Sequence, residues 1–197
     1  MSTFASITAV LEFWFGDPKT EDTGYLQRRK LWFQKKPAID QTIRDRFLDL
    51  YQKAAAGRLE DWQSSPQGCL ALLLLLDQFP RNMFRGDAQS FATDEKALAI
   101  AQTAIAKAFD QALTPEQRIF LYLPLEHSEN LTVQEQSVHL FQQLSTEYPQ
   151  LADTYDYALR HQAIIERFGR FPHRNAVLGR ETLPNEAEFL NQPGSSF

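Results

Sequence analysis

Apolar side chains recur along this sequence every third or fourth residue, which is the spacing that places them on one face of an α-helix. The clearest stripe has one apolar residue in every four, at Ile39, Ile43, Phe47 and Tyr51. No stretch of the sequence shows the strict alternation of apolar and polar residues that predicts a half-buried β-strand. The sequence therefore predicts an all-α protein.

Proline, glycine and threonine residues mark the expected ends of the helices. Pro37 suits the first turn of a helix that Gly57 ends, and Pro184 opens a last short helix. The sequences TPEQ from Thr114 and TVQE from Thr132 match the capping box, in which two side chains satisfy two free backbone amides. Together these signals predict about eight or nine helices.

Further boundaries are expected at other capping residues and prolines. Ser6 and Thr93 suit helix N-caps, and Pro80 and Pro124 are each predicted to end the preceding helix. A second helix is expected from about Asp22 to Gln34. Under this interpretation the polar residues that follow Pro80 and Pro124 lie at helix ends.

The length of 197 residues suits one domain, and because no linker divides the chain, residues 1–197 are expected to form a single helical domain. The N-terminus lacks the basic and apolar regions of a signal peptide. The longest apolar run, Leu70–Leu76, is far shorter than the roughly 20 residues of a membrane helix. The single cysteine, Cys69, fits a reducing compartment, so a cytoplasmic location is expected.

The net charge of −5 disfavours nucleic acid and anionic membranes as partners, since both attract broad basic surfaces. Three segments differ from this average. Asp77–Gly86 carries a net charge of +1, Glu126–Glu129 carries −2, and Arg167–Arg180 carries +4. If these segments meet in the fold, they form a positive region in an acidic chain, and an anionic ligand would balance its charge.

Charged residues alternate with bulky apolar ones in these segments, which is unfavourable unless the charges are paired or serve a ligand. In LLLLLDQFPRNMFRG, Asp77 and Arg81 have the spacing of a helical ion pair, and Arg85 follows them. In FLYLPLEHSEN, the adjacent Glu126 and His127 suit general acid and base chemistry. For both segments a structural role and a ligand-facing role stay open.

The third segment, RFGRFPHRNAVLGR, combines basic residues with phenylalanines. Arginine binds carboxylate or phosphate through two hydrogen bonds and stacks on aromatic rings, so these side chains are expected to be partly buried. Structural bridging and an anion site both explain the pattern. Across the three segments, the ligand-binding candidates are Asp77, Arg81, Arg85, Glu129, Arg167, Arg170, Arg174, Asn175 and Arg180.

No cofactor is expected. The sequence has no HExxH or other spaced set of metal ligands, no glycine-rich phosphate loop and no GxSxG nucleophile motif. His139 and His161 lie on expected helices without acidic residues at suitable spacing. Both are interpreted as surface or packing residues.

Seven sequence blocks occur together in this chain: LEFWFGDP, LWFQKKPAID, LLLLLDQFPRNMFRG, FLYLPLEHSEN, RFGRFPHRN, LGRET and the terminal PGSSF. In this order, from about Val10 to Phe197, they resemble the bacterial domain-of-unknown-function family 924. The resemblance implies a tetratricopeptide-like, right-handed superhelix of antiparallel helix pairs. It implies no activity.

Three functions stay open at this point. The leading hypothesis is a helical binding module with a partly buried, arginine-rich pocket for a small anionic ligand or a peptide carboxylate. The carboxylate of the chain's own tail, at Phe197, is one candidate occupant, and Trp14 and Trp32 are expected to form apolar walls.

An enzyme is the first alternative, as a hydrolase or lyase acting on a small anionic substrate. Glu126 or His127 would then act as acid or base, with His173 as partner. A structural scaffold, in which the polar residues only lock helix junctions, is the second alternative.

Overall fold

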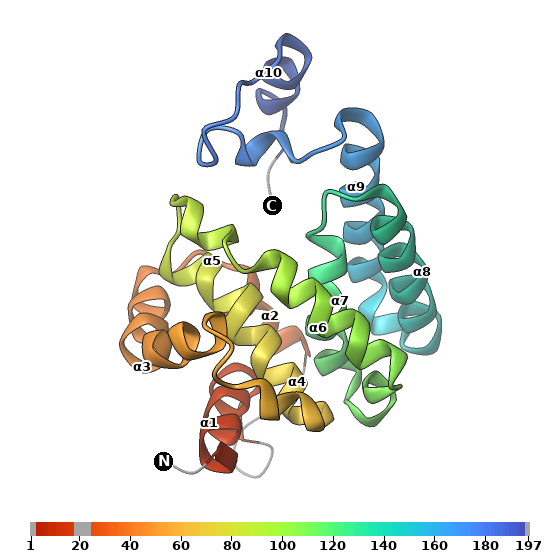
Figure 1. The fold of residues 1–197 in the computed structure, drawn as a ribbon. Helices are drawn as coiled ribbons and strands as arrows, with labels where there is room; N and C mark the ends of the chain where they lie inside the picture. Colours follow the sequence, from red (N-terminus) through yellow and green to blue (C-terminus); the bar gives the residue numbers. More distant parts are fainter. Residues whose placement is uncertain (1–2, 18–24, 196–197) are drawn as a thin grey trace. The chain divides into compact units, whose positions relative to one another are not determined.

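The computed structural model describes residues 3–17 and 25–195, and every regular element within them is helical (Figure 1). The α-helices are α1 (Thr3–Phe15), α2 (Tyr25–Phe33), α3 (Pro37–Ala55), α4 (Pro66–Leu73), α5 (Phe79–Met83), α6 (Asp94–Ala106), α7 (Pro115–Glu126), α8 (Leu131–Glu147), α9 (Ala152–Phe168) and α10 (Pro184–Leu190). A π-helical turn, Leu74–Gln78, joins α4 directly to α5. Short 3₁₀ turns lie at Glu60–Ser64, Ala88–Phe91, Phe109–Ala112, Pro149–Leu151 and Pro172–Arg174. The all-α prediction is confirmed, and with α4, the π turn and α5 counted as one helix, the described residues contain nine.

The chain divides into two compact units. Unit 1 contains residues up to 85 and residues 89–124, and unit 2 contains residues 86–88 and those from 125 onward. The expectation that residues 1–197 form one domain stays a prediction. None of the described helices is both long enough and apolar enough to cross a membrane.

The core of unit 1 is built from the leucine run and from aromatic rings. Every residue of Leu70–Leu76 is at most 2% exposed. The ring centroid of Trp14 lies 5.5 Å from that of Phe79 and 5.5 Å from that of Phe120. Trp32 lies 4.8 Å from Phe120 and donates its indole N–H to the Trp14 carbonyl at 2.8 Å. Both tryptophans therefore belong to a packed aromatic core, and a ligand-facing role for them stays a prediction.

The π turn explains how a proline fits within a continuous helix of unit 1. The prediction that Pro80 ends the helix is wrong, because α5 runs through it. Proline has no N–H to donate, and its ring clashes with the carbonyl four residues earlier, here that of Leu76. The Phe79 amide bonds five residues back to Leu74, and the Leu76 carbonyl accepts from the Thr93 hydroxyl at 2.5 Å instead. Thr93 occupies the N-cap position of α6, but its side chain does not cap the helix as predicted.

Replacing Thr93 by valine tests this compensation. Thr93→Val keeps the shape of the side chain but leaves the buried Leu76 carbonyl without its hydroxyl donor, which should cost about 1–2 kcal/mol. We expect the melting temperature to fall by about 2–8 °C. The matched control is Thr103→Val on α6, because the Thr103 hydroxyl makes only a local, exposed bond to Ala99 at 2.9 Å. Equal melting temperatures for the two variants would contradict this account of the π turn.

Unit 2 is organised around the helices α8 and α9, which lie side by side and are joined by the short turn Tyr148–Leu151, so that they run antiparallel (Figure 1). Their buried residues are Gln134, Ser137, Phe141 and Leu144 on α8, and Thr154, Ala158, His161, Ile164 and Ile165 on α9. This pair agrees with the expected tetratricopeptide-like architecture, and the right-handed superhelix itself stays a prediction.

Several helix ends can be compared with the sequence signals. The capping box at Thr114 is confirmed, because its hydroxyl accepts from the Gln117 amide at 3.4 Å and its amide donates to the Gln117 side chain at 3.1 Å. The box predicted at Thr132 is wrong, because α8 begins earlier and Asn130 caps it by accepting from the Val133 amide at 3.2 Å.

The prediction that Pro124 breaks the preceding helix is wrong as well, because Pro124 lies inside α7, which continues to Glu126. Ser6 does not cap the first helix, because α1 already begins at Thr3. The first residues of the second predicted helix, from Asp22, lie outside the described residues. The confirmed helix starts are Pro37 of α3 and Pro184 of α10.

Candidate functional site

The charged residues of the first segment make ion pairs within unit 1. Asp77 is 1% exposed, and its carboxylate lies 3.3 Å from the guanidinium of Arg81. Arg81 also makes two hydrogen bonds of 3.0 Å to Asp94 at the start of α6. Arg85 pairs with Asp40 of α3 at 3.0 Å. These contacts fasten α5 to α6 and α3, so they match the structural interpretation of this segment.

Arg170 of the third segment binds a carboxylate of α10. Its guanidinium donates to both carboxylate oxygens of Glu186, at 2.6 and 2.8 Å. The Leu183 amide and the side chain of Asn175 donate to the same carboxylate at 2.7 and 3.1 Å. The hydrogen bond from Arg170 is the main cause that lowers the pKa of Glu186 to about 2. This group fixes α10 to the segment that follows α9.

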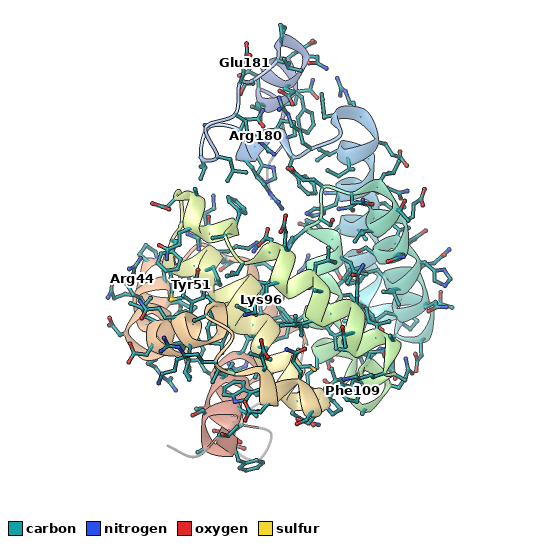
Figure 2. All side chains as sticks on the ribbon, viewed as in Figure 1. Arg44, Tyr51, Lys96, Phe109, Arg180 and Glu181 are labelled. Carbon is teal, nitrogen blue, oxygen red and sulfur yellow. The ribbon has the colours of Figure 1, made fainter. Side chains whose placement is uncertain are left out.

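Arg180 makes a second network with Glu129, the residue just before the N-cap of α8. Two hydrogen bonds of 2.7 and 3.1 Å join their side chains, and the Phe171 amide donates to Glu129 at 2.8 Å. Burial acts to raise the pKa of Glu129, but the hydrogen bonds from Arg180 and Phe171 outweigh it and lower the pKa. Arg180 also donates to Asn175 at 3.0 Å, which links the two networks. Figure 2 shows Arg180 beside Glu181 on the stretch between α9 and α10.

Arg167 is exposed, and its guanidinium lies 4.7 Å from the ring of Phe168 and 5.8 Å from that of Phe189. Arg167 thus stacks on aromatic rings at the surface of unit 2, and these contacts do not favour a ligand-binding role for it.

A different set of side chains gathers around Phe171, and we call it the histidine–arginine cluster. Its members are Glu126, His127, His161, His173 and Arg174. The rings of His161 and His173 lie 5.5 and 5.7 Å from that of Phe171, and the Arg174 guanidinium lies 4.4 Å from it. Arg174 donates to the His127 carbonyl at 3.0 Å, and the rings of His127 and His161 are 6.3 Å apart.

His161 is the most buried imidazole of the cluster. Its Nδ1 lies 2.8 Å from the Tyr157 carbonyl and 3.2 Å from the Glu126 carboxylate. Both of these groups are acceptors, so Nδ1 carries the proton and Nε2 is left as an acceptor. Burial is the main cause that lowers the pKa of His161 to about 3; the hydrogen bond to Tyr157 acts in the opposite direction, and the electrostatic effects of His127, Arg174 and His173 add to the lowering. His161 is therefore neutral at physiological pH.

The backbone that carries His127 is fixed by α8. The side-chain amide of Gln134, which is fully buried, donates to the carbonyls of Glu126 and Ser128, both at 2.6 Å. These two carbonyls flank His127, whose own carbonyl accepts from Arg174. Three hydrogen bonds thus set the position of the His127 backbone.

Access to the cluster differs between its members. Glu126, His161 and Arg174 are 3%, 4% and 7% exposed, whereas His127 and His173 are half-buried. His127 and His173 are therefore the members of the cluster that reach solvent. Among the described residues, no group of three histidine, cysteine or acidic side chains has an arrangement that could hold a metal ion.

The structure thus brings Glu126, His127, His173 and Arg174 together in unit 2, with Glu129, Arg170, Asn175 and Arg180 in the two adjoining networks. Two important residues were missed by the sequence interpretation. His161 is not only a packing residue, because it contacts Glu126. Its spacing to Ala158, Ile164 and Ile165 could have indicated that it lies on the buried face of α9. Glu186 lies in a short acidic helix, and the sequence around it has no signal that separates it from its exposed neighbour Glu188.

The fold and the cluster define an all-helical protein with several buried charged side chains. Residues 10–194 match the family described as "Bacterial protein of unknown function (DUF924)", and the chain belongs to this family, which confirms the resemblance. The solved structure of a protein of unknown function from Agrobacterium tumefaciens is 39% identical to this chain, with a TM-score of 0.83, over 96% of this chain and 99% of that one. No curated protein matches the sequence.

Proposed function

We propose that this chain is a helical binding module that holds a small anionic group at the histidine–arginine cluster. The observation that carries the proposal is the environment of His161, whose protonation is opposed by burial and by the charges of His127, Arg174 and His173. Burial disfavours a charge of either sign, whereas the electrostatic effects of His127, Arg174 and His173 disfavour an added positive charge and favour an added negative one.

Arg174 supplies the permanent positive charge of this site. Its guanidinium is stacked on Phe171 and hydrogen-bonded to the His127 carbonyl, so its orientation is set before a ligand arrives. A planar guanidinium with several N–H donors is the side chain best suited to carboxylate or phosphate. The half-buried His127 and His173 give an anion a route to it and add donors of their own.

The proposed ligand is a phosphate-like or carboxylate anion. The more specific proposal is the carboxylate of a peptide C-terminus. One source of such a carboxylate is a partner protein, and another is this chain's own tail at Phe197, which lies outside the described residues. Nucleic acid and membranes are not proposed as partners, because the net charge is −5. A reducing, cytoplasmic compartment stays a prediction from the lone, buried Cys69.

Calorimetric titration of the full chain tests the proposal. The probes are inorganic phosphate, sulfate and the pentapeptide PGSSF with either a free carboxylate or a C-terminal amide. We expect Arg174→Gln to weaken anion binding at least about tenfold, which corresponds to one charge-assisted hydrogen bond. The matched control is Arg167→Gln, because Arg167 is exposed and lies outside the cluster, and its binding should stay within about twofold of wild type.

The controls separate folding from recognition. Arg174→Lys keeps the charge but not the planar fork, so it should bind with intermediate affinity if the variant melts like wild type. Preference for the free carboxylate of PGSSF over its amide would assign the site to peptide termini, and binding of the inorganic ions alone would assign it to small anions. The proposal fails if Arg174→Gln and Arg167→Gln bind every probe as wild type does.

A second candidate function is a hydrolase or lyase, and the contact between Glu126 and His161 favours it, because acidic residues commonly orient catalytic imidazoles. A pKa of about 3 makes His161 a weak base near neutrality, so His127 or His173 would have to transfer the proton. Hydrolysis of a phosphate or carboxylate ester that Glu126→Gln abolishes and Arg167→Gln preserves would favour the enzyme over the binding module.

A further inference from the structure

A pair of buried oxygen atoms lies on α8, outside every contact used so far. Gln134 and Ser137 are both 0% exposed, and they are three residues apart, so their side chains leave the same face of the helix. It is the buried face of α8, the helix that packs against α9. Within the described part of the chain, neither Oε1 of Gln134 nor Oγ of Ser137 has a hydrogen-bond partner.

The orientation of the Gln134 side chain is fixed, so its oxygen cannot exchange places with its nitrogen. The amide nitrogen donates to two carbonyls, those of Glu126 and Ser128, each at 2.6 Å. Turning the amide over would place its oxygen against both carbonyls, which are acceptors as well. Oε1 must therefore point the other way, as a buried acceptor.

Ser137 presents the complementary group. A serine within a helix can donate to the carbonyl one turn earlier, as Ser145 of the same helix does to Gln142 at 3.0 Å. Ser137 makes no such bond, although its hydroxyl is fully buried. A buried polar atom without a partner costs free energy comparable to a lost hydrogen bond, so native structures rarely leave two beside each other.

We propose that an internal water molecule occupies the interface between α8 and α9 and bridges Ser137 and Gln134. The water accepts from the Ser137 hydroxyl and donates to Oε1 of Gln134, which satisfies both atoms at once. Water is the ligand of choice because the two groups are neutral, one of them only accepts, and both are closed off from solvent. The proposal does not rest on anion binding at the histidine–arginine cluster.

The melting temperature of the Ser137→Ala variant tests the proposal, because the presence or absence of the water decides whether it falls. Ser137→Ala removes one oxygen and hardly changes the packing, so it removes one hydrogen bond of the water if the water is present. We then expect the melting temperature of the full chain to fall by about 2–4 °C. If the interface is dry, the same change removes an unsatisfied hydroxyl, and the melting temperature should stay the same or rise. The matched control is Ser145→Ala on the same helix, for which the shift should stay within about 1 °C.

A high-resolution crystal structure of the unmodified chain gives an independent answer. The proposal predicts electron density for one water within hydrogen-bond distance of both Ser137 Oγ and Gln134 Oε1. It is overturned if the Ser137 hydroxyl instead donates to a backbone carbonyl of α8, with no density between the two side chains. An unchanged or higher melting temperature for Ser137→Ala overturns it as well.

Discussion

Replacing Glu186 by glutamine should destabilise the protein by about 3 kcal/mol, which corresponds to a melting temperature about 6–12 °C lower. The carboxylate is 1% exposed and accepts four hydrogen bonds, two from Arg170 and one each from Leu183 and Asn175. Glutamine has the same shape, but it is neutral, and its NH₂ group faces donors. The Arg170 guanidinium would then lose its partly buried counter-charge.

The control for this prediction lies two residues further along α10. Glu188→Gln makes the same chemical change at an exposed position, so its effect should stay within about 0.5 kcal/mol. Thermal and urea denaturation of the two variants measure the difference, and limited proteolysis near α10 shows whether the loss is local to unit 2. Indistinguishable melts of the two variants would mean that the network contributes little.

Acidification should destabilise the wild-type chain by about 3 kcal/mol more than the His161→Asn variant between pH 7 and pH 4. In the unfolded chain His161 takes up a proton near its ordinary pKa of about 6.5, whereas in the folded chain burial and cationic neighbours lower the pKa to about 3. Over this interval the unfolded state binds more protons, so stability falls as the pH falls. The stability from the neutral imidazole is complete above about pH 6.5 and is lost progressively towards pH 3.

Urea denaturation at several pH values measures this effect. Asparagine is chosen because its side-chain NH₂ group takes the place of Nδ1–H, which faces Tyr157 and Glu126. The variant should be less stable at pH 7, but its stability should depend less on pH. His139→Asn on the exposed face of α8 is the matched control and should follow the wild-type pH dependence. If the free energy of unfolding depends on pH in the same way for wild type and His161→Asn, another group controls acid unfolding.

The helices could be predicted from the sequence because their signals are local. The starts at Pro37 and Pro184 depend on residues within one or two turns, and these starts were predicted correctly. Pro80 and Pro124 were not, because the local rule for proline takes no account of what the rest of the fold supplies. For Pro80 that contribution is the Thr93 hydroxyl, which satisfies the carbonyl that the proline leaves unbonded.

The charged residues were predicted less completely because their partners are distant in sequence. The expectation of buried arginines in the third segment agrees with Arg174, which is 7% exposed. Periodicity and composition cannot reveal that Arg180 binds Glu129, 51 residues away, or that Arg170 binds Glu186. Nor can they reveal that the partner of the acidic Glu126 is the imidazole of His161 on α9, because that contact exists only after the helices have packed.

The place of Glu186 on the last helix has a practical consequence for shortened versions of this chain. A fragment that stops at Leu183 keeps α8 and α9 whole, yet it discards the carboxylate that neutralises Arg170 and anchors Asn175. Such a fragment would expose the adjoining Phe168 ring, which packs on Phe189 of the discarded helix at 5.1 Å. Trimming for crystallisation or for fusion to a reporter should therefore leave every residue up to Leu190 in place.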